Sequence, residues 1–138
     1  MSIELVTPLK AITLAALPAI GGDLDGIFGG TYIGLTTAKD GSNYAVVLRP
    51  ARTEDLTWQA AMDWAKKQGG ELPTRPVAAL LYANAKAQLS DGWHWTNETD
   101  EDDSSFAWNC NFYHGSQLYH HKSYEASVVA VRLIPLIA

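Results

Sequence analysis

The sequence has 138 residues, 47% of them apolar, and its ten basic and fifteen acidic side chains give a formal net charge of −5. This length and apolar content predict one domain with its own hydrophobic core. The negative charge argues against nucleic acid and anionic membranes as partners, because a negative field repels their phosphate groups.

An apolar segment lies near the start of the chain. Residues 9–22 read LKAITLAALPAIGG, which is shorter than the roughly 20 residues that a membrane span needs. Glu4 and Pro8 interrupt the basic leader that is typical of a cleaved secretion signal. We therefore expect residues 1–28 to form an arm that packs on the domain or on a neighbouring subunit.

Two segments rich in β-branched and aromatic residues follow the arm. Residues 31–37 (TYIGLTT) and 44–50 (YAVVLRP) are typical of strands, and Asp40-Gly41 between them is a turn signal. Together they predict a β-hairpin.

Two helices are predicted in the middle of the chain. Thr57 can cap the first, whose apolar side chains recur at helical spacing until Gly69 and Gly70 end it. Thr74 can cap the second, which extends to about Leu89.

The last third of the chain returns to strand-like composition. The order of strands, two helices and strands predicts an α+β fold with an antiparallel sheet rather than alternating βαβ units. The late strands are predicted in WHWTN (93–97), SFAWNCNFY (105–113), SQLYHHKS (116–123) and ASVVAVRLI (126–134).

Five short blocks, in this order, carry a resemblance to a known family. They are GGELPTR (69–75), WHWTNE (93–98), FAWNCNFYHGSQ (106–117), Lys122 and VVAVRLI (128–134). Over about residues 29–136 the chain resembles the collagen-like-adhesin C-terminal domain family, a bacterial and bacteriophage family of largely unknown function.

The resemblance implies a C-type-lectin-like fold, in which two helices flank a twisted antiparallel sheet and the ligand surface lies on the late strands and loops. The chain then divides into an arm (1–28) and a C-type-lectin-like domain (29–138). Similar proteins are often adhesins, tail-fibre tips or other recognition modules, and several form trimers. The resemblance therefore implies a phage or prophage origin, a place in a virion or the bacterial cytoplasm, and a homo-oligomer, with a trimer favoured.

Two ligand types of similar domains are not indicated by the residues. C-type lectins that bind sugar through calcium share a Glu-Pro-Asn type loop and a Trp-Asn-Asp strand, and the chain has neither. The adhesin relatives are associated with sulfated polysaccharides, but a chain with a charge of −5 offers no evident basic stripe for sulfate.

The stretch from residue 106 to residue 123 is predicted to form a hairpin that turns at His114-Gly115. Strand alternation then predicts a core face with Trp108, Cys110 and Phe112, and an outward face with Asn109, Asn111 and Tyr113. His94 is expected on the solvent side of its strand, because Trp93 and Trp95 are expected to point inward.

Aromatic rings beside amides and imidazoles give contact area at low entropic cost, together with adaptable hydrogen bonds, which suits recognition. The alternative is a solvated strand face with no partner. The predicted ligand contacts are Asn109, Asn111, Tyr113, His114, Gln117, Tyr119 and His121, with Trp93 and Trp95 as supporting aromatics.

Metal and catalytic chemistry are less favoured by the pattern. His120 and His121 are neighbours on a strand and point to opposite faces, so they do not converge on one ion. The acidic loop at residues 97–105 (NETDEDDSS) could bind calcium, but it lacks the spacing and the central glycine of a calcium loop. Cys110 is expected to be buried, and no catalytic motif is present. We therefore predict no cofactor and no enzymatic activity, with calcium at the acidic loop as the alternative.

Taken together, the sequence predicts a recognition module that binds a glycan or a protein on a cell surface through its late strands and loops. Two alternatives remain open. One is a structural or assembly subunit of a virion or oligomer that uses the arm. The other is an acidic inhibitor of a host protein.

Overall fold

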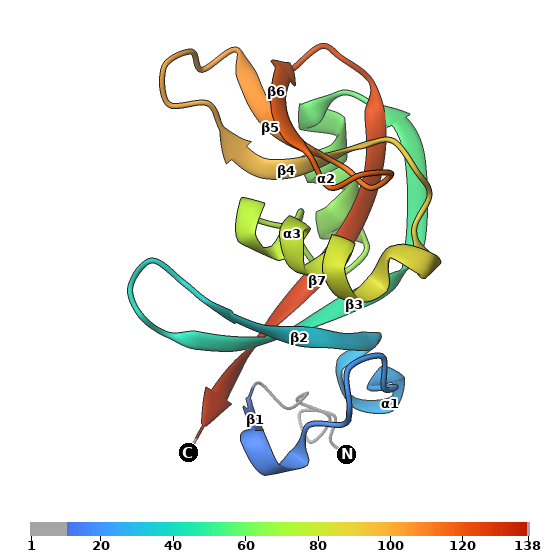
Figure 1. Cartoon of the computed structure of the whole chain (residues 1–138), viewed down its shortest axis with the longest axis vertical. Helices are drawn as coiled ribbons and strands as arrows, with labels where there is room; N and C mark the ends of the chain where they lie inside the picture. The colour runs from blue at the N-terminus through green and yellow to red at the C-terminus, as the bar shows by residue number, and fades with distance from the viewer. Residues whose placement is uncertain (1–10, 138) are drawn as a thin grey trace, which may run out of the picture.

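The structure is a computed structural model that describes residues 11–137, and it contains one curved sheet with helices packed against it (Figure 1). The strands are β1 (Ile12–Thr13), β2 (Thr31–Thr37), β3 (Asn43–Leu56), β4 (Trp93–Thr99), β5 (Phe106–Asn111), β6 (Gln117–His121) and β7 (Ala126–Ile137). The helices are α1 (Asp25–Phe28), α2 (Trp58–Lys67) and α3 (Arg75–Ala85), with short 3-10 turns η2 (Leu14–Ala16) and η3 (Lys86–Gln88). The predicted α+β class is therefore confirmed.

The sheet is mixed rather than antiparallel. Its strands are hydrogen-bonded in the order β2-β3-β7-β4-β5-β6, and β1 pairs with β7. Most neighbours are antiparallel, but β7 runs parallel to both β1 and β4. The prediction of an antiparallel sheet is therefore wrong for these two strand pairs, which are parallel. The reason is that β7 does not form a hairpin with β6 but pairs in the middle of the sheet with β3 and β4.

The predicted early hairpin is present as β2 and β3. Thr31 pairs with Leu48 and Thr37 with Asn43, and Gly41 in the connecting turn has a φ of +88°. β3 continues beyond the predicted strand to Leu56, because its second half pairs with β7.

Both predicted long helices are also present. α2 begins after Thr57, although the Thr57 side chain makes no capping hydrogen bond. α3 begins after Thr74, whose hydroxyl accepts a hydrogen bond of 3.2 Å from the backbone N–H of Val77. α3 ends at Ala85. Within residues 11–137, no helix is long and apolar enough to cross a membrane.

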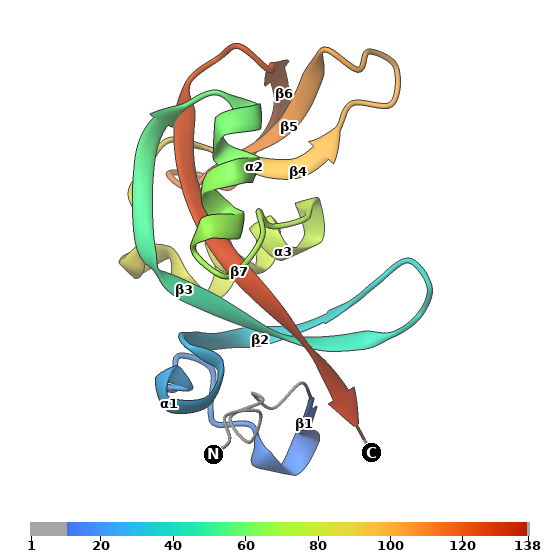
Figure 2. The ribbon, with the colours of Figure 1, turned by 180° about the vertical axis from the view of Figure 1, so that it is seen from behind.

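α2 and α3 cover opposite faces of β7, as the front and back views show (Figures 1 and 2). Val128 and Ala130 belong to the buried cluster that contains α2, whereas Val129 and Val131 belong to the cluster that contains α3. Because side chains alternate along a strand, these two sets lie on opposite sides of the sheet. The middle of the sheet is therefore buried on both faces.

The described part of the arm packs on the domain. Ile12, Leu24 and Phe28 are buried in a third apolar cluster together with Tyr32 and Ile134. β1 adds to this packing by pairing with the last residues of β7. Residues 1–10, which the predicted arm includes, lie outside the described residues.

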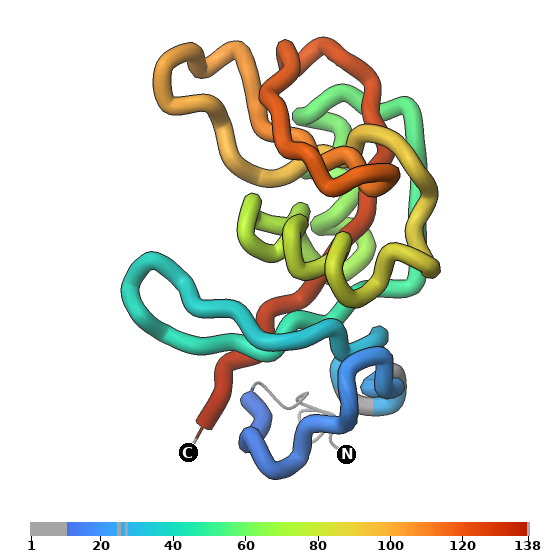
Figure 3. The backbone as a smooth tube through the Cα atoms, viewed as in Figure 1, coloured from blue at the N-terminus to red at the C-terminus, as the bar shows by residue number. Residues whose placement is uncertain are grey.

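Two loops project from the same side of the molecule (Figure 3). One is the turn between β2 and β3. The other is the loop between β4 and β5, residues 100–105, which is the part of the predicted acidic loop (97–105) that lies outside β4 and which keeps the name acidic loop below. The turned view of Figure 2 places both loops on a common side as well. In Figure 1 the start of α3 lies between them, and the end of β6 lies above it.

Candidate functional site

The β5–β6 hairpin carries four aromatic or imidazole rings on one face, which we call the aromatic face: Phe106, Trp108, Tyr119 and His121. Phe106 pairs with His121, and Trp108 pairs with Tyr119 across the two antiparallel strands. Directly opposite residues of such a pair share a face, so the register alone brings the four rings together. The hairpin turn that fixes this register contains Gly115, with a φ of +82°.

The rings of the aromatic face contact one another edge to face. The ring centres of Trp108 and Tyr119 are 5.3 Å apart with their planes at 82°, and those of Phe106 and Tyr119 are 5.7 Å apart at 86°. His121 lies 5.4 Å from Phe106 in the same arrangement. Such aromatic pairs contribute about 0.5–1.5 kcal/mol each beyond their burial. Tyr119 nevertheless keeps 46% of its surface exposed, so the rings are held in place yet remain accessible.

Arg75, at the start of α3, lies on the aromatic face and is held there by a clamp. Its guanidinium carbon is 3.6 Å from the centre of the Trp108 ring. Its Nε donates a hydrogen bond of 2.9 Å to Oε1 of Gln117, and Nε2 of Gln117 donates one of 2.8 Å to the Arg75 carbonyl. The backbone N–H of Arg75 donates to Oε2 of Glu98 at 2.7 Å. This clamp ties α3 to β4 and β6 and fixes the cation over the tryptophan.

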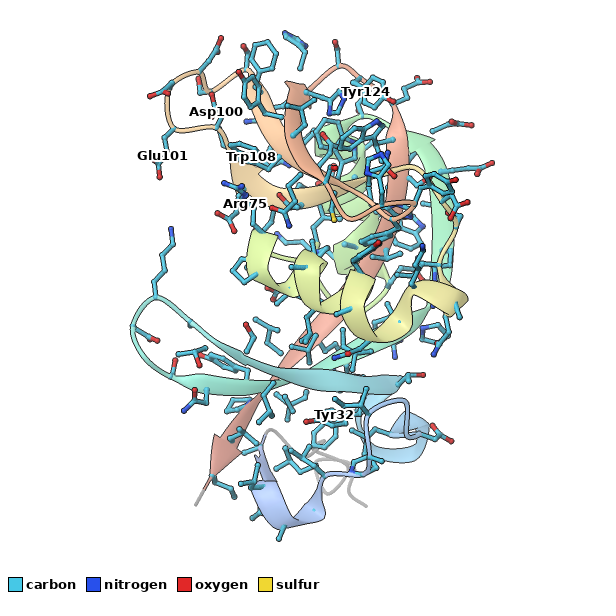
Figure 4. The ribbon with its side chains drawn as sticks, in the orientation of Figure 1. Tyr32, Arg75, Asp100, Glu101, Trp108 and Tyr124 are labelled. Atoms are coloured by element: carbon cyan, nitrogen blue, oxygen red, sulfur yellow. The ribbon has the colours of Figure 1, made fainter. Side chains whose placement is uncertain are left out.

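The acidic loop lies beside the aromatic face, and Figure 4 shows Asp100 and Glu101 on this loop near Arg75 and Trp108. Asp103, in the same loop, accepts hydrogen bonds from the hydroxyl of Ser105 at 2.6 Å and from its backbone N–H at 3.0 Å. These bonds, and to a smaller extent the nearby His121, lower the pKa of the Asp103 carboxyl. Asp103 is therefore a negatively charged group of this loop at neutral pH.

A cleft of about 280 Å³ opens next to the clamp, between the β2–β3 hairpin and the start of α3. Apolar atoms form most of its wall, with Pro76 and Leu133 among them. Glu98 and Lys39 line both this cleft and a shallower hollow that continues to Gln117. A ligand on the aromatic face could thus extend past the clamp into the cleft.

The tip of the β5–β6 hairpin forms a separate group. Tyr113 is 63% exposed, and its carbonyl accepts a hydrogen bond of 2.9 Å from Nζ of Lys86. Asn111 uses its side-chain oxygen to accept a bond from the Tyr113 N–H, and His114 contacts the hydroxyl of Ser116 at 2.9 Å. Asn111 and His114 therefore make hydrogen bonds within the turn, and the exposed rings of the tip are those of Tyr113 and His114.

On the opposite face of the hairpin, His120 of β6 packs against Trp93 of β4 and against Tyr124, which follows β6. The His120 ring stacks on Tyr124 at 4.5 Å and meets the edge of Trp93 at 4.8 Å. Its Nδ1 donates to Oδ1 of Asn109 at 2.8 Å, and burial lowers the pKa of the His120 imidazole. The structure thus separates Trp93 from Tyr119 and His121, with which it was predicted to act.

Two predicted contacts lie in the interior. Asn109 and Trp95 have no exposed surface, so neither belongs to an accessible site in this conformation. The reason is that α2 and the strands around it cover this face of β4 and β5. Conversely, Trp108 was predicted on the core face but is only partly buried, because α3 covers that face at Cys110 and leaves the start of β5 open.

His94 was expected on the solvent side and is instead only 2% exposed. Its ring packs 4.2 Å from Phe112, and its Nδ1 lies 3.0 Å from the Gly92 carbonyl. Burial lowers the pKa of His94 to about 4, against the opposing effect of the Gly92 hydrogen bond. The prediction that His94 faces solvent is wrong, because α3 and Phe112 cover the face of β4 opposite to α2.

The predicted contacts that the structure brings together are Tyr119 and His121, with Gln117 in the clamp beside them. Sequence reasoning missed Arg75, Phe106 and Trp108 as members of this group. The turn signal at His114-Gly115 does not by itself give the pairing, because a two-residue turn there would set Phe106 opposite Ser123 and Trp108 opposite His121. In the structure the Asn111 N–H bonds to the Ser116 carbonyl, so the turn has four residues, 112–115, and Phe106 lies opposite His121 and Trp108 opposite Tyr119.

Among residues 11–137, no group of three or more His, Cys, Asp or Glu side chains is placed to hold a metal ion. Cys110 is fully buried, and burial raises the pKa of its thiol. A buried thiol with a raised pKa is a poor nucleophile, because the thiolate is the reactive form. The accessible chemistry of the aromatic face consists of ring surfaces, one fixed cation and neighbouring carboxylates.

No protein-family model matches this sequence, and no curated protein matches it at a significant level.

Proposed function

We propose that this protein is a non-enzymatic recognition module that binds a glycan or a protein on a cell surface through its aromatic face. In keeping with the sequence resemblance, we further propose a C-type-lectin-like domain of phage or prophage origin. The observation that carries the proposal is the row of Phe106, Trp108, Tyr119 and His121, whose rings are in mutual contact while Tyr119 stays 46% exposed.

The rigidity of the aromatic face supports a binding role. Rings that are already locked in place lose little conformational entropy when a ligand covers them, so more of the contact energy appears as affinity. The clamp formed by Arg75 and Gln117 adds hydrogen bonds that hold the arginine over Trp108 without a ligand. Exposed aromatic side chains fixed in this way are typical of the few residues that dominate a binding interface.

The decisive experiment compares two tyrosines of similar exposure. Tyr119 is 46% exposed on the aromatic face, and Tyr124 is 41% exposed on the opposite face, where it stacks on His120. We expect Tyr119→Ala to weaken binding to intact bacterial cells and to arrayed glycans by about tenfold or more, which is the usual loss for a central aromatic contact. Tyr124→Ala should leave binding nearly unchanged.

Both variants should be checked for folding by thermal denaturation before binding is measured. Equal binding by Tyr119→Ala and the unaltered protein, to every cell and glycan that the unaltered protein recognises, would contradict the proposal. Equal losses in the two tyrosine variants would contradict it too, since they would point to a general effect on the hairpin.

A second candidate is an assembly subunit that self-associates at the opposite end of the molecule. Leu14, Leu35 and Ile137 are exposed there by 62%, 44% and 52%. Leu14 and Leu35 line one apolar hollow, together with Leu80 of α3 and Leu136 of β7. Sedimentation of the unaltered protein and of Leu14→Ser tests this candidate, because an oligomer formed at this end should dissociate in the variant.

A further inference from the structure

β6 is the last strand of the sheet and has one free edge. Among the described residues, 11–137, the hydrogen-bonded order ends at β6, which pairs with β5 alone. Its first residue, Gln117, pairs with Cys110, and its last, His121, pairs with Phe106. Such an edge presents backbone groups that another extended segment can use.

The printed bonds at the two ends of the hairpin show which β6 residues face outward. The N–H of Asn111 donates to the Ser116 carbonyl at 2.8 Å, and the N–H of Lys122 donates to the Ser105 carbonyl at 2.8 Å. In an antiparallel pair, residues alternate between bonding to the neighbouring strand and pointing away from it. Ser116, Leu118, His120 and Lys122 therefore bond towards β5. The backbone groups of Gln117, Tyr119 and His121 point away from it.

Most of these outward groups are unused. The His121 carbonyl accepts a hydrogen bond of 2.9 Å from the N–H of Tyr124. The N–H groups of Gln117, Tyr119 and His121 and the carbonyls of Gln117 and Tyr119 have no hydrogen-bond partner within residues 11–137. The alternation that turns these backbones outward also places the three side chains on the face that carries Trp108. The free edge and the aromatic face are therefore contiguous.

The charge beside this edge is negative. The acidic loop leads directly into Phe106, so Asp102 and Asp103 lie near the His121 end of β6. Lys122, which directly follows β6, is turned away, with its Nζ 4.1 Å from the centre of the Trp58 ring. Lys39 lines the hollow that reaches Gln117, at the other end of β6. Arg75 is committed to Trp108 and Gln117. A segment that reaches the His121 end of this edge therefore meets the carboxylates of the acidic loop.

We propose that the β6 edge accepts an extended segment of a protein partner as an added strand, and that this segment carries lysine or arginine at alternate positions. Main-chain hydrogen bonds to Gln117 and Tyr119 supply the pairing, as in other complexes that extend a sheet. Every second side chain of the added strand lies beside the aromatic face. A cation there contacts the Tyr119 ring and the carboxylates of the acidic loop together.

This inference rests on the proposed function of the aromatic face, and it names a protein segment rather than a glycan as the ligand.

The inference can be tested because the Tyr119 N–H points away from β5. Ligation at Cys110 joins a synthetic fragment of residues 110–138 to residues 1–109, and the fragment can carry an N-methyl group on Tyr119. The methyl group removes the outward donor but keeps the tyrosine ring and the pairing with β5. The ligated protein without the methyl group is the control, and both must show the same thermal denaturation.

The probe is a displayed library of random peptides of about seven residues, long enough to cover one strand. Selection on the control protein should enrich peptides with alternating lysine or arginine. Their affinity should fall about tenfold or more for the N-methylated protein, as expected when a main-chain hydrogen bond is lost and its partner left unpaired. Raising the salt concentration should also lower the affinity of these peptides, because salt screens the attraction between opposite charges.

Three outcomes would overturn the inference. The first is selection of peptides without basic residues, or of none at all. The second is an unchanged affinity of the peptides for the N-methylated protein, combined with loss of binding of the same peptides or of a glycan in Tyr119→Ala. That result would contradict strand addition at the β6 edge but would agree with the proposed function of the aromatic face. The third is a dimer that the N-methyl group dissociates in sedimentation, because a second copy would then occupy the edge. Failure of the proposed function itself would give a different result. In that case neither Tyr119→Ala nor the N-methyl group on Tyr119 would change the affinity of any ligand that the protein binds.

Discussion

The guanidinium carbon of Arg75 lies 3.6 Å above the ring centre of Trp108, and the Gln117 side chain holds it there through two hydrogen bonds to the same arginine. The three residues come from α3, β5 and β6, so the clamp joins the helix to the hairpin that carries the aromatic face. An arginine stacked on an aromatic ring at this distance is favourably placed for a cation–π interaction. The stability of the hairpin and the order of the binding surface should therefore depend on Gln117.

Replacement of Gln117 by leucine should destabilise the protein. The change removes both bonds and leaves the Arg75 Nε and carbonyl unpaired in a partly buried position, which costs about 1–2 kcal/mol. Urea denaturation followed by tryptophan fluorescence measures the loss. Gln59→Leu is the matched control, since Gln59 makes a single exposed hydrogen bond to Asp63 on α2. Similar losses of unfolding free energy in both variants would show that the clamp contributes no more to stability than the exposed hydrogen bond of Gln59 does.

Gly115 and Gly92 offer a second comparison. Both have positive φ angles, +82° and +104°, so alanine is strained at either position. A Cβ at Gly115 would lie 2.7 Å from the Tyr82 ring of α3, whereas a Cβ at Gly92 would meet nothing within 4 Å. Gly115→Ala should therefore cost about 1–2 kcal/mol more than Gly92→Ala, because overpacking adds to the backbone strain. Denaturation midpoints of the two variants give this difference, and equal midpoints would mean that the hairpin tip does not pack on α3.

The parts of the fold that sequence reasoning predicted correctly are those with local signals. The turn residues Asp40-Gly41 and His114-Gly115 mark two hairpins, and Thr74 caps α3 through its own hydroxyl. Such signals depend on a few neighbouring residues and need no knowledge of the rest of the chain.

The orientation of β5 could not be predicted in the same way. Alternation correctly separates Trp108 from Asn109, but it does not say which side a distant helix will cover. That choice depends on where β7 enters the sheet, because α2 and α3 pack on its two sides. The result is that both faces near Cys110 are buried and Asn109 is enclosed. Its Nδ2 has no hydrogen-bond partner within the described residues, a cost that hydrophobic patterning cannot anticipate.

Cys110 should resist chemical modification in the folded protein. It is fully buried between the hairpin and α3, and burial raises the pKa of its thiol. Reaction with a thiol reagent at neutral pH should therefore be slow in buffer and rapid in concentrated urea, where the chain is unfolded. The rate in buffer then measures opening of the β5 region. Rapid, complete modification without denaturant would contradict the placement of this strand in the core.

His94 should make the stability of the protein depend on pH. Burial lowers the pKa of His94 in the folded state to about 4 from a reference value of 6.5, and the charge of Arg52 lowers it further in a smaller way. Between these two pH values the unfolded chain binds a proton that the folded protein does not. The free energy of unfolding therefore falls as the pH decreases from 6.5 towards 4, by about 3 kcal/mol at most.

Comparison with His94→Gln isolates this contribution. Glutamine keeps a polar side chain near Ser90 and Gly92 but does not titrate, so the variant should start from a lower stability at neutral pH and lose less of it on acidification. Urea midpoints measured for both proteins at several pH values between neutrality and about pH 4 give the two slopes. Other groups, including His120 with its lowered pKa, act in both proteins and cancel in the difference. Parallel slopes would mean that His94 becomes protonated without cost, and that the face of β4 against Phe112 is open to water.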